Sequence, residues 1–368
     1  MAKRKIVTVI GTRPQFIKYS VLSSAINGNF NEILIDTGQH YSKNLSDFFI
    51  DELNIRRPKY RFDIKDSVPL AQISTMILQL QKVMENEKPA AMLCFGDTNS
   101  TLSAAIVASK LSVPFAHIEA GERNFDTKGK MAHPFTITEE TNRVVTDHLS
   151  SLLLCSSRRA VKNLESESVK GKIEFTGDIM YDLYLQSIKK VKAGSKILSG
   201  LNLKPRSYYF CTVHRAINTD SRTRMVNLFE ALKALDKPVV FPMHPRTRKA
   251  LEEFGLFAKF SKIKNLLILE PVGYRDSLML SHNAAFVLTD SGGVVREAYF
   301  SGVPSVMLDD TSEWRDLFLS GWSVLAGDNT RVIVNSVKKF KRPAARSSFF
   351  GSGHAANKTI SAIKNWLN

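Results

Sequence analysis

Cysteine is scarce in this chain: three of its 368 residues are cysteines, Cys94, Cys155 and Cys211. The number is odd and the three lie far apart, so neither a disulfide framework nor a cysteine-ligated metal is expected. Cys94 and Cys211 stand inside apolar runs, which favours buried free thiols. Such cysteines fit a reducing compartment, so we expect a cytoplasmic protein.

Long hydrophobic runs are also missing. No stretch approaches the roughly 20 apolar residues that a membrane-spanning helix needs, so no membrane partner is expected. Near the amino terminus, the apolar residues after Lys5 end at Gly11, which is too early for a signal peptide. Both absences argue against a membrane protein or a secreted one.

Acidic residues are in the minority, with 35 Asp and Glu against 51 Lys and Arg and a net charge of +16. This excess favours an anionic partner: nucleic acid, a membrane surface or a phosphorylated small molecule. The basic residues are mostly scattered, without an aromatic-interleaved stripe or zinc-finger spacing. Nucleic acid is therefore the weaker interpretation, and a solvated basic surface is the simplest one.

The length exceeds what one hydrophobic core usually supports, so two domains are expected. Short apolar runs alternate with helical patterns, and the plan restarts after the basic segment 189–206. Such runs imply parallel sheets with both faces covered. We predict an α/β fold of two Rossmann-like domains facing a cleft (GT-B-like): residues 1–178 and 179–354, with a C-terminal helix in 355–368 that packs back on the first domain.

Beyond the carboxyl ends of parallel strands, open sheets bind their ligands. The residues that follow eight predicted strands are mostly polar or charged, which turn formation alone does not explain: 11–13, 38–41, 96–99, 119–123, 214–218, 244–248, 270–274 and 290–293.

The stretch Leu288–Pro304, LTDSGGVVREAYFSGVP, has the strongest individual pattern. An apolar strand is followed by a Ser/Gly turn and by a helix, with the helix expected from Val294. Glycines and a helix N-terminus favour phosphate oxygens, and Glu297 lies one turn further on, within reach of hydroxyls. An ordinary tight turn is the alternative interpretation.

At these positions the chain resembles the non-hydrolysing UDP-N-acetylglucosamine 2-epimerase family over essentially its whole length. The resemblance rests on many ordered motifs: GTRPQFIK at 11–18, TGQHY at 37–41, GDTNSTLSAA at 96–105, HIEAG at 117–121, EETNRVVTDH at 139–148, TGD at 176–178, VHR at 213–215, HPRTRK at 244–249, EPVGY at 270–274 and LTDSGG at 288–293.

The resemblance implies the fold of nucleotide-sugar glycosyltransferases, with UDP held mainly by the second domain. It also implies inversion at C2 of a UDP-linked 2-acetamido sugar, of the UDP-GlcNAc to UDP-ManNAc type, for surface polysaccharide precursors. A base removes the C2 proton as UDP leaves C1, and UDP re-adds to the glycal after the proton returns to the other face. The resemblance implies a homodimer. It implies neither NAD nor any other cofactor, and no metal.

Carried over by position, the resemblance implies two groups of site residues. Acid/base, charge-balancing and diphosphate-adjacent roles fall to Asp97, Glu119, Glu139, His214, Arg143 and Lys18. Substrate binding falls to Arg13, Gln39, His244, Tyr274, Ser291, Gly292, Gly293 and Glu297.

Structural roles are open alternatives for several of these residues. Asp97 and Thr98 are also typical helix N-caps. Glu119 is alternatively paired with Arg123 or Arg143 in a buried ion pair, Glu139 and Arg143 have the i,i+4 spacing of a helical pair, and His214 is alternatively a structural histidine. Gln39 and His40 fit a turn as well as a substrate contact.

Two departures from the family pattern bear on the substrate. The loop 121–138 is longer than expected, and SEWR at 312–315 replaces the usual run. The second departure resembles the branch that acts on UDP-2,3-diacetamido-2,3-dideoxy-glucuronic acid, so that sugar is an alternative, and we expect the loop to decide it. An allosteric UDP-sugar site is poorly matched around HYSKNL at 40–45. The rival functions are a GT-B glycosyltransferase, a hydrolysing epimerase and a nucleic-acid binder.

Overall fold

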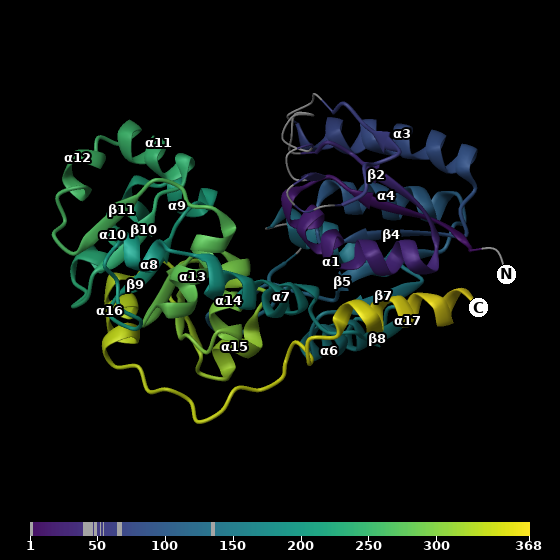
Figure 1. Cartoon of the computed structure of the whole chain (residues 1–368). Coiled ribbons are helices and arrows are strands. Elements are labelled where there is room, and N and C mark those ends of the chain that lie inside the picture. The colour runs from purple at the N-terminus through teal and green to yellow at the C-terminus, as the bar shows by residue number, and fades with distance from the viewer. Residues whose placement is uncertain are drawn as a thin grey trace. The chain divides into compact units, whose positions relative to one another are not determined.

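The computed structural model describes residues 3–39, 47, 50–51, 53, 55–64, 68–133 and 137–368. The chain forms two compact units (Figure 1). Unit 1 comprises Met1–Arg123, Ala132–Leu183 and Ser348–Asn368, and unit 2 comprises Asn124–Met131 and Tyr184–Ser347. The domain limits expected from the sequence stay a prediction.

Unit 1 is built on a parallel sheet with the strand order β3-β2-β1-β4-β5-β7-β8. In chain order its strands are β1 (Lys5–Ile10), β2 (Asn31–Asp36), β3 (Tyr60–Arg61), β4 (Ala91–Phe95), β5 (Phe115–Ala120), β7 (Leu152–Cys155) and β8 (Lys172–Phe175). Its helices are α1 (Arg13–Asn29), α3 (Pro69–Glu87), α4 (Asn99–Lys110), α5 (Thr138–Leu149), α6 (Arg158–Ser166) and α17 (Ala355–Leu367).

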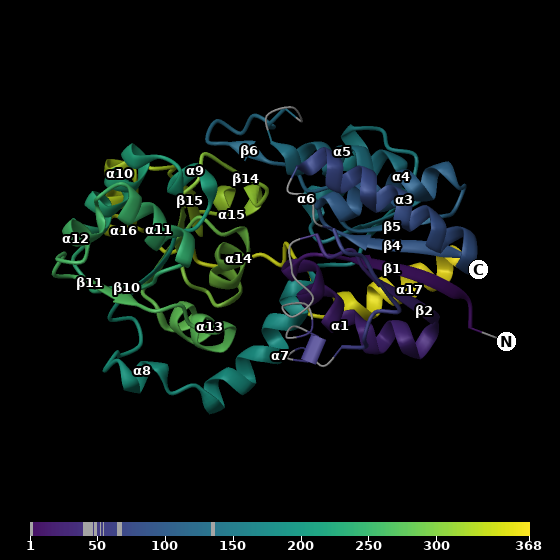
Figure 2. The ribbon, with the colours of Figure 1, turned by 90° about the horizontal axis from the view of Figure 1, so that it is seen from above.

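The central strands of unit 1 are largely apolar because helices cover both faces of the sheet. Along β1, Ile6 and Ile10 pack on the face covered by α1 and α17, whereas Val7 and Val9 pack on the face covered by α3 and α4. Figure 2 shows α17 beside α1. Each such fully buried aliphatic side chain stabilises the fold by about 1.5–3 kcal/mol. The C-terminal helix therefore belongs to unit 1, as predicted.

Unit 2 repeats the plan with a parallel sheet of order β11-β10-β9-β12-β13-β15. Its strands are β9 (Tyr209–Thr212), β10 (Val239–Pro242), β11 (Leu266–Leu269), β12 (Phe286–Thr289), β13 (Ser305–Met307) and β15 (Ser323–Leu325). Its helices are α8 (Ile197–Gly200), α9 (Ala216–Thr219), α10 (Arg222–Lys233), α11 (Pro245–Glu253), α12 (Phe257–Phe260), α13 (Tyr274–Asn283), α14 (Gly292–Phe300), α15 (Arg315–Leu319) and α16 (Thr330–Lys338). Helix α7 (Ile179–Gly194) contains the division between the units.

The segment Asn124–Met131 leaves unit 1 in sequence but packs in unit 2. Its strand β6 (Phe125–Asp126) pairs antiparallel with β14 (Thr311–Ser312). Arg315 stacks on Phe125, with 4.8 Å between the guanidinium carbon and the ring centroid. The two departures from the family pattern, the long loop and the SEWR run, are therefore in contact.

The prediction of two parallel α/β units is confirmed, and the eight strand ends expected from the sequence lie within two residues of the observed ones. The sequence interpretation missed the short strands β3 and β8 and most of α7. All three cysteines are free and buried. Within the part of the chain that the structure describes, no helix has the length and apolar character to cross a bilayer.

Candidate active site

Glu119 stands at an irregular point of the unit 1 sheet. It has a left-handed backbone with φ of 69°, and the register of β5 against β7 shifts between Ile118 and Ala120. Such a bulge redirects a side chain, and a non-glycine residue in this conformation costs about 1–3 kcal/mol. The Glu119 carboxylate forms an ion pair with Lys18 of α1, and the two side chains are only 13% and 11% exposed. The strain therefore holds a mostly buried carboxylate at the strand end.

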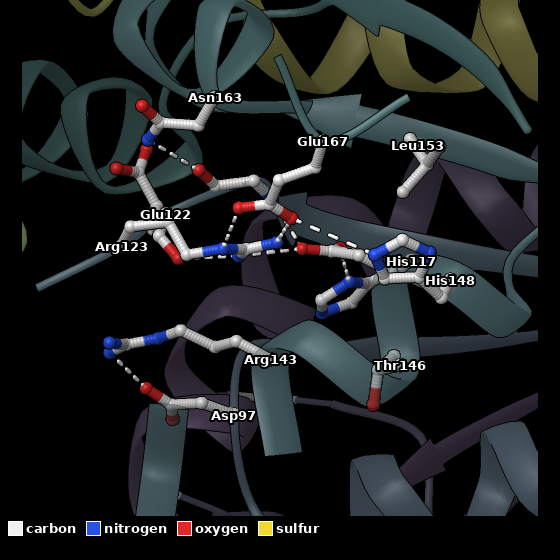
Figure 3. Close-up of polar contacts among 12 residues, drawn as sticks. Asp97, His117, Glu122, Arg123, Arg143, Thr146, His148, Leu153, Asn163 and Glu167 are labelled. Carbon is white, nitrogen blue, oxygen red and sulfur yellow. Dashed lines mark hydrogen bonds and ion pairs between the residues drawn. The ribbon is translucent and has the colours of Figure 1, made fainter. Parts of the chain in front are cut away.

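Asp97 follows β4 and forms an ion pair with Arg143 of α5 (Figure 3). The helix cap that was an alternative role for Asp97 is made instead by Thr98, whose hydroxyl accepts from the Thr101 N–H at 3.3 Å. Burial alone would raise the pKa of Asp97, but Arg143 and Lys18 outweigh it and hold that pKa below its usual value. Asp97 is therefore kept ionised.

Gly96 brings the turn that carries Asp97 close to the Glu119–Lys18 pair. It directly precedes Asp97 and has a φ of +66°. A side chain at Gly96 would come within 3.3 Å of Glu119 Oε2 and 3.4 Å of Lys18 Nζ. Glycine thus meets both the backbone conformation and the space that the ion pair takes.

The paired glutamates at the start of α5 have different surroundings. Glu139 is exposed, whereas Glu140 is buried. Arg143 Nη1 lies 3.2 Å from Glu140 Oε2, and its other described carboxylate partner is Asp97. The described ion pairs of Arg143 are therefore not the i,i+4 pair with Glu139 that was the alternative.

Two further predicted residues of unit 1 are found at the starts of helices: Arg13 by its position and Gln39 by its hydrogen bonds. Arg13 is the first residue of α1 and is exposed. The side-chain oxygen of Gln39 accepts from the N–H and the hydroxyl of Ser100 at 2.9 and 2.7 Å, at the first turn of α4. His40, which shares its motif, lies outside the described residues, as does the HYSKNL stretch.

A pocket opens beside the Glu119–Lys18 pair, at the carboxyl ends of β5, β7 and β8. Its lining combines this pair with a second acid from the TGD motif, and it consists of Lys18, Ile118, Glu119, Leu154, Ser156, Thr176, Gly177, Asp178 and Ile179. A polar ligand group at this place would meet both charges of the pair.

A buried network of charged side chains lies near Asp97 (Figure 3), and no role in the site was predicted for it from the sequence. Arg123 is fully buried and binds both oxygens of Glu167, at 2.8 and 2.6 Å. It also pairs with Asp147 at 2.8 Å, and Asp147 lies 2.7 Å from His117. The polar residue His117 inside an apolar strand was the one available signal.

In unit 2, His214 follows β9 and is oriented by Asp290, which follows the neighbouring strand β12. The Asp290 carboxylate accepts from the backbone N–H groups of His214 and Arg215, both at 2.8 Å. His214 Nδ1 lies 3.4 Å from the other carboxylate oxygen. The buried Asp290 therefore ties two strand ends together.

His244 faces His214, with their ring centroids 5.3 Å apart. It follows β10 and caps α11, because its Nδ1 accepts from the N–H of Arg246 at 3.1 Å. An accepting Nδ1 carries no proton, so the proton of a neutral His244 is on Nε2.

The Ser/Gly turn forms the first turn of α14, which begins at Gly292 and not at Val294 as expected. Ser291 caps this helix by accepting from the Val294 N–H at 3.4 Å. A side chain at Gly292 would lie 2.7 Å from Glu313 Oε1. A carboxylate thus already lies near this N-terminus, whose dipole favours negative charge.

Glu297 lies one turn further along α14 and is 7% exposed. Burial raises its pKa to about 7, although Tyr274 and Arg296 act in the opposite direction. The pKa of the Tyr274 phenol is in turn raised by burial and by Glu297. The two predicted substrate-binding residues Tyr274 and Glu297 are therefore neighbours.

The structure thus gathers the predicted residues into a group in each unit. In unit 1, Lys18 pairs with Glu119 and Arg143 pairs with Asp97, whereas Arg13 and Glu139 are exposed. In unit 2, one sheet edge carries the two histidines and the start of α14. Two parallel α/β units with polar strand ends place the chain in the GT-B-like class of folds.

Comparison with known proteins narrows this class. The sequence model of the UDP-N-acetylglucosamine 2-epimerase family matches residues 24–364, and the chain belongs to this family. A UDP-N-acetylglucosamine 2-epimerase homolog of Methanococcus maripaludis is 40% identical over 98% of this chain and 99% of its own length. The UDP-2,3-diacetamido-2,3-dideoxy-D-glucuronate 2-epimerase of Pseudomonas aeruginosa is 38% identical over 96% and 98%.

A solved structure gives the same result at the level of the fold. The UDP-GlcNAc 2-epimerase of Methanocaldococcus jannaschii, crystallised in complex with UDP-GlcNAc and UDP, superimposes with a TM-score of 0.85. The two sequences are 36% identical, and the superposition covers 98% of this chain and 99% of the other.

Proposed function

We propose that the protein is a non-hydrolysing epimerase that inverts C2 of a UDP-linked 2-acetamido sugar, of the UDP-GlcNAc to UDP-ManNAc type. UDP leaves C1 as the C2 proton is removed, and it re-adds to the glycal after a proton returns to the opposite face. The cytoplasm as its location, a homodimer and the absence of a nucleic-acid or membrane partner belong to the same proposal.

The observation that carries this proposal is the pair of adjacent carboxylates in unit 1, each held by a cation. Asp97 is paired with Arg143 and Glu119 with Lys18, and a side chain at Gly96 would meet the second pair. Proton transfer at carbon needs positioned acid and base groups, and departure of a diphosphate needs positive charge. A glycosyltransferase has no need of such a second acid/base group. Glu139, at the exposed start of α5, is assigned to the same proton transfers.

The UDP moiety is assigned to unit 2. The first turn of α14 offers backbone N–H groups to a diphosphate, and Ser291, Gly292 and Gly293 form that turn. Ionised Glu297 is suited to accept hydrogen bonds from the two ribose hydroxyls, with Tyr274 beside it. His214 and His244 are assigned to the diphosphate. Arg13 and Gln39 of unit 1 are assigned to substrate binding.

The second candidate is the same reaction on UDP-2,3-diacetamido-2,3-dideoxy-glucuronic acid. It is favoured by the SEWR run, which resembles that branch and which is in contact with the long loop. The 38% identical relative from Pseudomonas aeruginosa is a 2-epimerase named for that sugar. Arg315, which stacks on Phe125, supplies a positive charge in this region, and this charge would attract the additional carboxylate of such a sugar.

Incubation with each UDP-sugar in deuterated water, followed by proton NMR, tests both candidates. We expect deuterium at C2 together with the C2-inverted UDP-sugar, for one of the two substrates and without any acceptor. Release of the free sugar with UDP would instead indicate a hydrolysing epimerase. Turnover that requires an acceptor and leaves C2 unlabelled would indicate a glycosyltransferase.

A further inference from the structure

Fully buried His117 faces two acceptors at once. Its Nδ1 lies 2.7 Å from Asp147 Oδ1, and its Nε2 lies 2.7 Å from the carbonyl oxygen of Gly96. A carbonyl oxygen only accepts, so Nε2 must carry a proton. A neutral imidazole would then present a bare Nδ1 to Asp147, and this contact needs a proton on one of the two partners.

Asp147 is not the partner that carries this proton. Its other oxygen accepts from the Gly121 N–H at 3.1 Å and lies 2.8 Å from Arg123 Nη1. Burial alone would raise the pKa of Asp147, but His117 and Arg123 outweigh it and hold that pKa below its usual value. An ionised carboxylate accepts from all three donors, and the charge-assisted contact with the buried Arg123 guanidinium favours this ionised form.

We propose that His117 is an imidazolium, protonated on both ring nitrogens, and that it acts as a positioning residue for Asp97 and Glu119. Its two hydrogen bonds connect three segments: β5, helix α5 and the turn after β4. Gly96, whose carbonyl it binds, directly precedes Asp97. Asp147, its counter-ion, accepts a hydrogen bond from the Gly121 N–H. His117 and Asp147 thus fix the backbone on both sides of the strained Glu119 along the chain.

The charged groups around His117 come from each neighbouring segment. Asp147 lies on α5, Arg123 on the chain after β5, and Asp97 on the turn after β4; the buried Cys155 thiol lies on β7 near Asp147. A positive charge at His117 therefore acts on Asp97 together with the charge of Arg143, the ion-pair partner of Asp97. Removing that charge favours protonation of Asp97.

The protonation state is measured on the full chain labelled with ¹⁵N-histidine, by long-range ¹H–¹⁵N correlation between pH 6 and 9. Among the described histidines His117 alone is fully buried, so slow exchange of its ring N–H protons in deuterated water identifies it. We expect two protonated ring nitrogens across this range. A bare ring nitrogen on this residue at pH 8 would overturn the proposal.

The consequence for turnover rests on the proposed function, and two neutral variants test it. His117→Gln can retain the bond to Gly96, and His117→Asn can retain the bond to Asp147. If the charge matters, both variants shift the acidic limb of the pH profile of kcat/KM to higher pH, so that the loss at pH 6 exceeds that at pH 8. His354→Gln, at an exposed histidine directly before α17, is the matched control and leaves the profile unchanged.

If the acidic limb of the pH profile shifts in only one of the two variants, or in neither, His117 does not act on Asp97 and Glu119 through its charge and the proposal is overturned. If a variant does not fold, as judged by circular dichroism, the NMR result on the unmodified chain still decides the protonation state. Two protonated nitrogens in a protein that turns over neither UDP-sugar would confirm the imidazolium and refute the proposed function.

Discussion

At the scale of single residues, the surroundings of two carboxylates give them opposite behaviour. Asp97 faces Arg143 and Lys18, and these cations lower its pKa in spite of burial. Glu297 is buried against Tyr274 with weaker compensation, and its pKa rises to about 7. One carboxylate is therefore ionised throughout the neutral range, whereas the other changes charge within it.

Removal of the proton-transfer carboxylates, or of the histidine assigned to the diphosphate, should abolish most of the turnover while the fold stays intact. Asp97→Asn and Glu119→Gln are each expected to lower kcat by about 10²–10⁴-fold, the usual contribution of a general acid or base. His214→Ala is expected to lower it by about 10²–10³-fold, because a group that stabilises the departing diphosphate is lost. Steady-state kinetics by NMR measures the loss, and circular dichroism verifies the fold. Glu252→Gln, at an exposed carboxylate of α11, is the control. Unchanged rates in all three variants would refute the site assignment.

The affinity for UDP should depend on the ionisation of Glu297. Its pKa of about 7 means that the carboxylate gains its charge as the pH rises through 7. An ionised carboxylate accepts two hydroxyl hydrogen bonds, so we expect UDP to bind more tightly at pH 8 than at pH 6. Calorimetric titration of the wild type and of Glu297→Gln separates this effect from the titration of the phosphate. The same pH dependence in both proteins would contradict the prediction.

Elements of the fold also show how the site is held in place. Strand β5 ends in the bulge at Glu119, and the next turn, at Gly121, has a φ of +80°. A side chain at Gly121 would lie 2.5 Å from the carbonyl oxygen of Ala160 and 2.8 Å from Leu164 Cγ. The chain at this turn therefore needs glycine for its backbone conformation and for the close approach of α6.

Gly121→Ala should consequently destabilise unit 1 by about 2–5 kcal/mol, from backbone strain and overpacking together. Gly28→Ala is the matched control, because Gly28 lies within α1 with nothing within 4 Å of an added side chain. That change is expected to stabilise by about 0.4–1 kcal/mol. Urea unfolding followed by circular dichroism measures both values. A stability of Gly121→Ala equal to that of the wild type would rule out the proposed close packing.

For the molecule as a whole, the net charge of +16 attracts anions over a distance that depends on the salt concentration. Salt at 0.1 M screens exposed charges beyond about 10 Å, and 1 M salt beyond about 3 Å. A diphosphate ligand benefits from the positive field, whereas uncharged uridine does not. The excess positive charge is therefore expected to favour the anionic part of a nucleotide sugar.

The affinity for UDP is accordingly expected to fall several-fold when the salt concentration rises from 0.05 to 0.5 M, with uridine binding nearly constant. Calorimetry in matched buffers measures both. Duplex DNA serves as the competing anion: tight, salt-sensitive DNA binding by a chain that does not turn over UDP-sugars would favour the nucleic-acid alternative.

The sequence by itself determined the plan of the fold and where to search for the site. Strands such as Leu152–Cys155 and Leu266–Leu269 are visible in the sequence, since a buried parallel strand is a local apolar run. The residues at strand ends followed from the same plan, because parallel strands place their carboxyl ends at one edge. The short strand β8, with its polar sequence KIEF, gave no such signal.

Only the tertiary structure decided which partner each charged side chain takes. Lys18 meets Glu119, 101 positions away, and Asp97 meets Arg143, 46 positions away. The pairing of β6 with β14 and the two acceptors of His117 are of the same kind. The physical reason is that such contacts depend on the order of strands in the sheet and on the bulge in β5, whereas sequence periodicity reports only on neighbours along the chain.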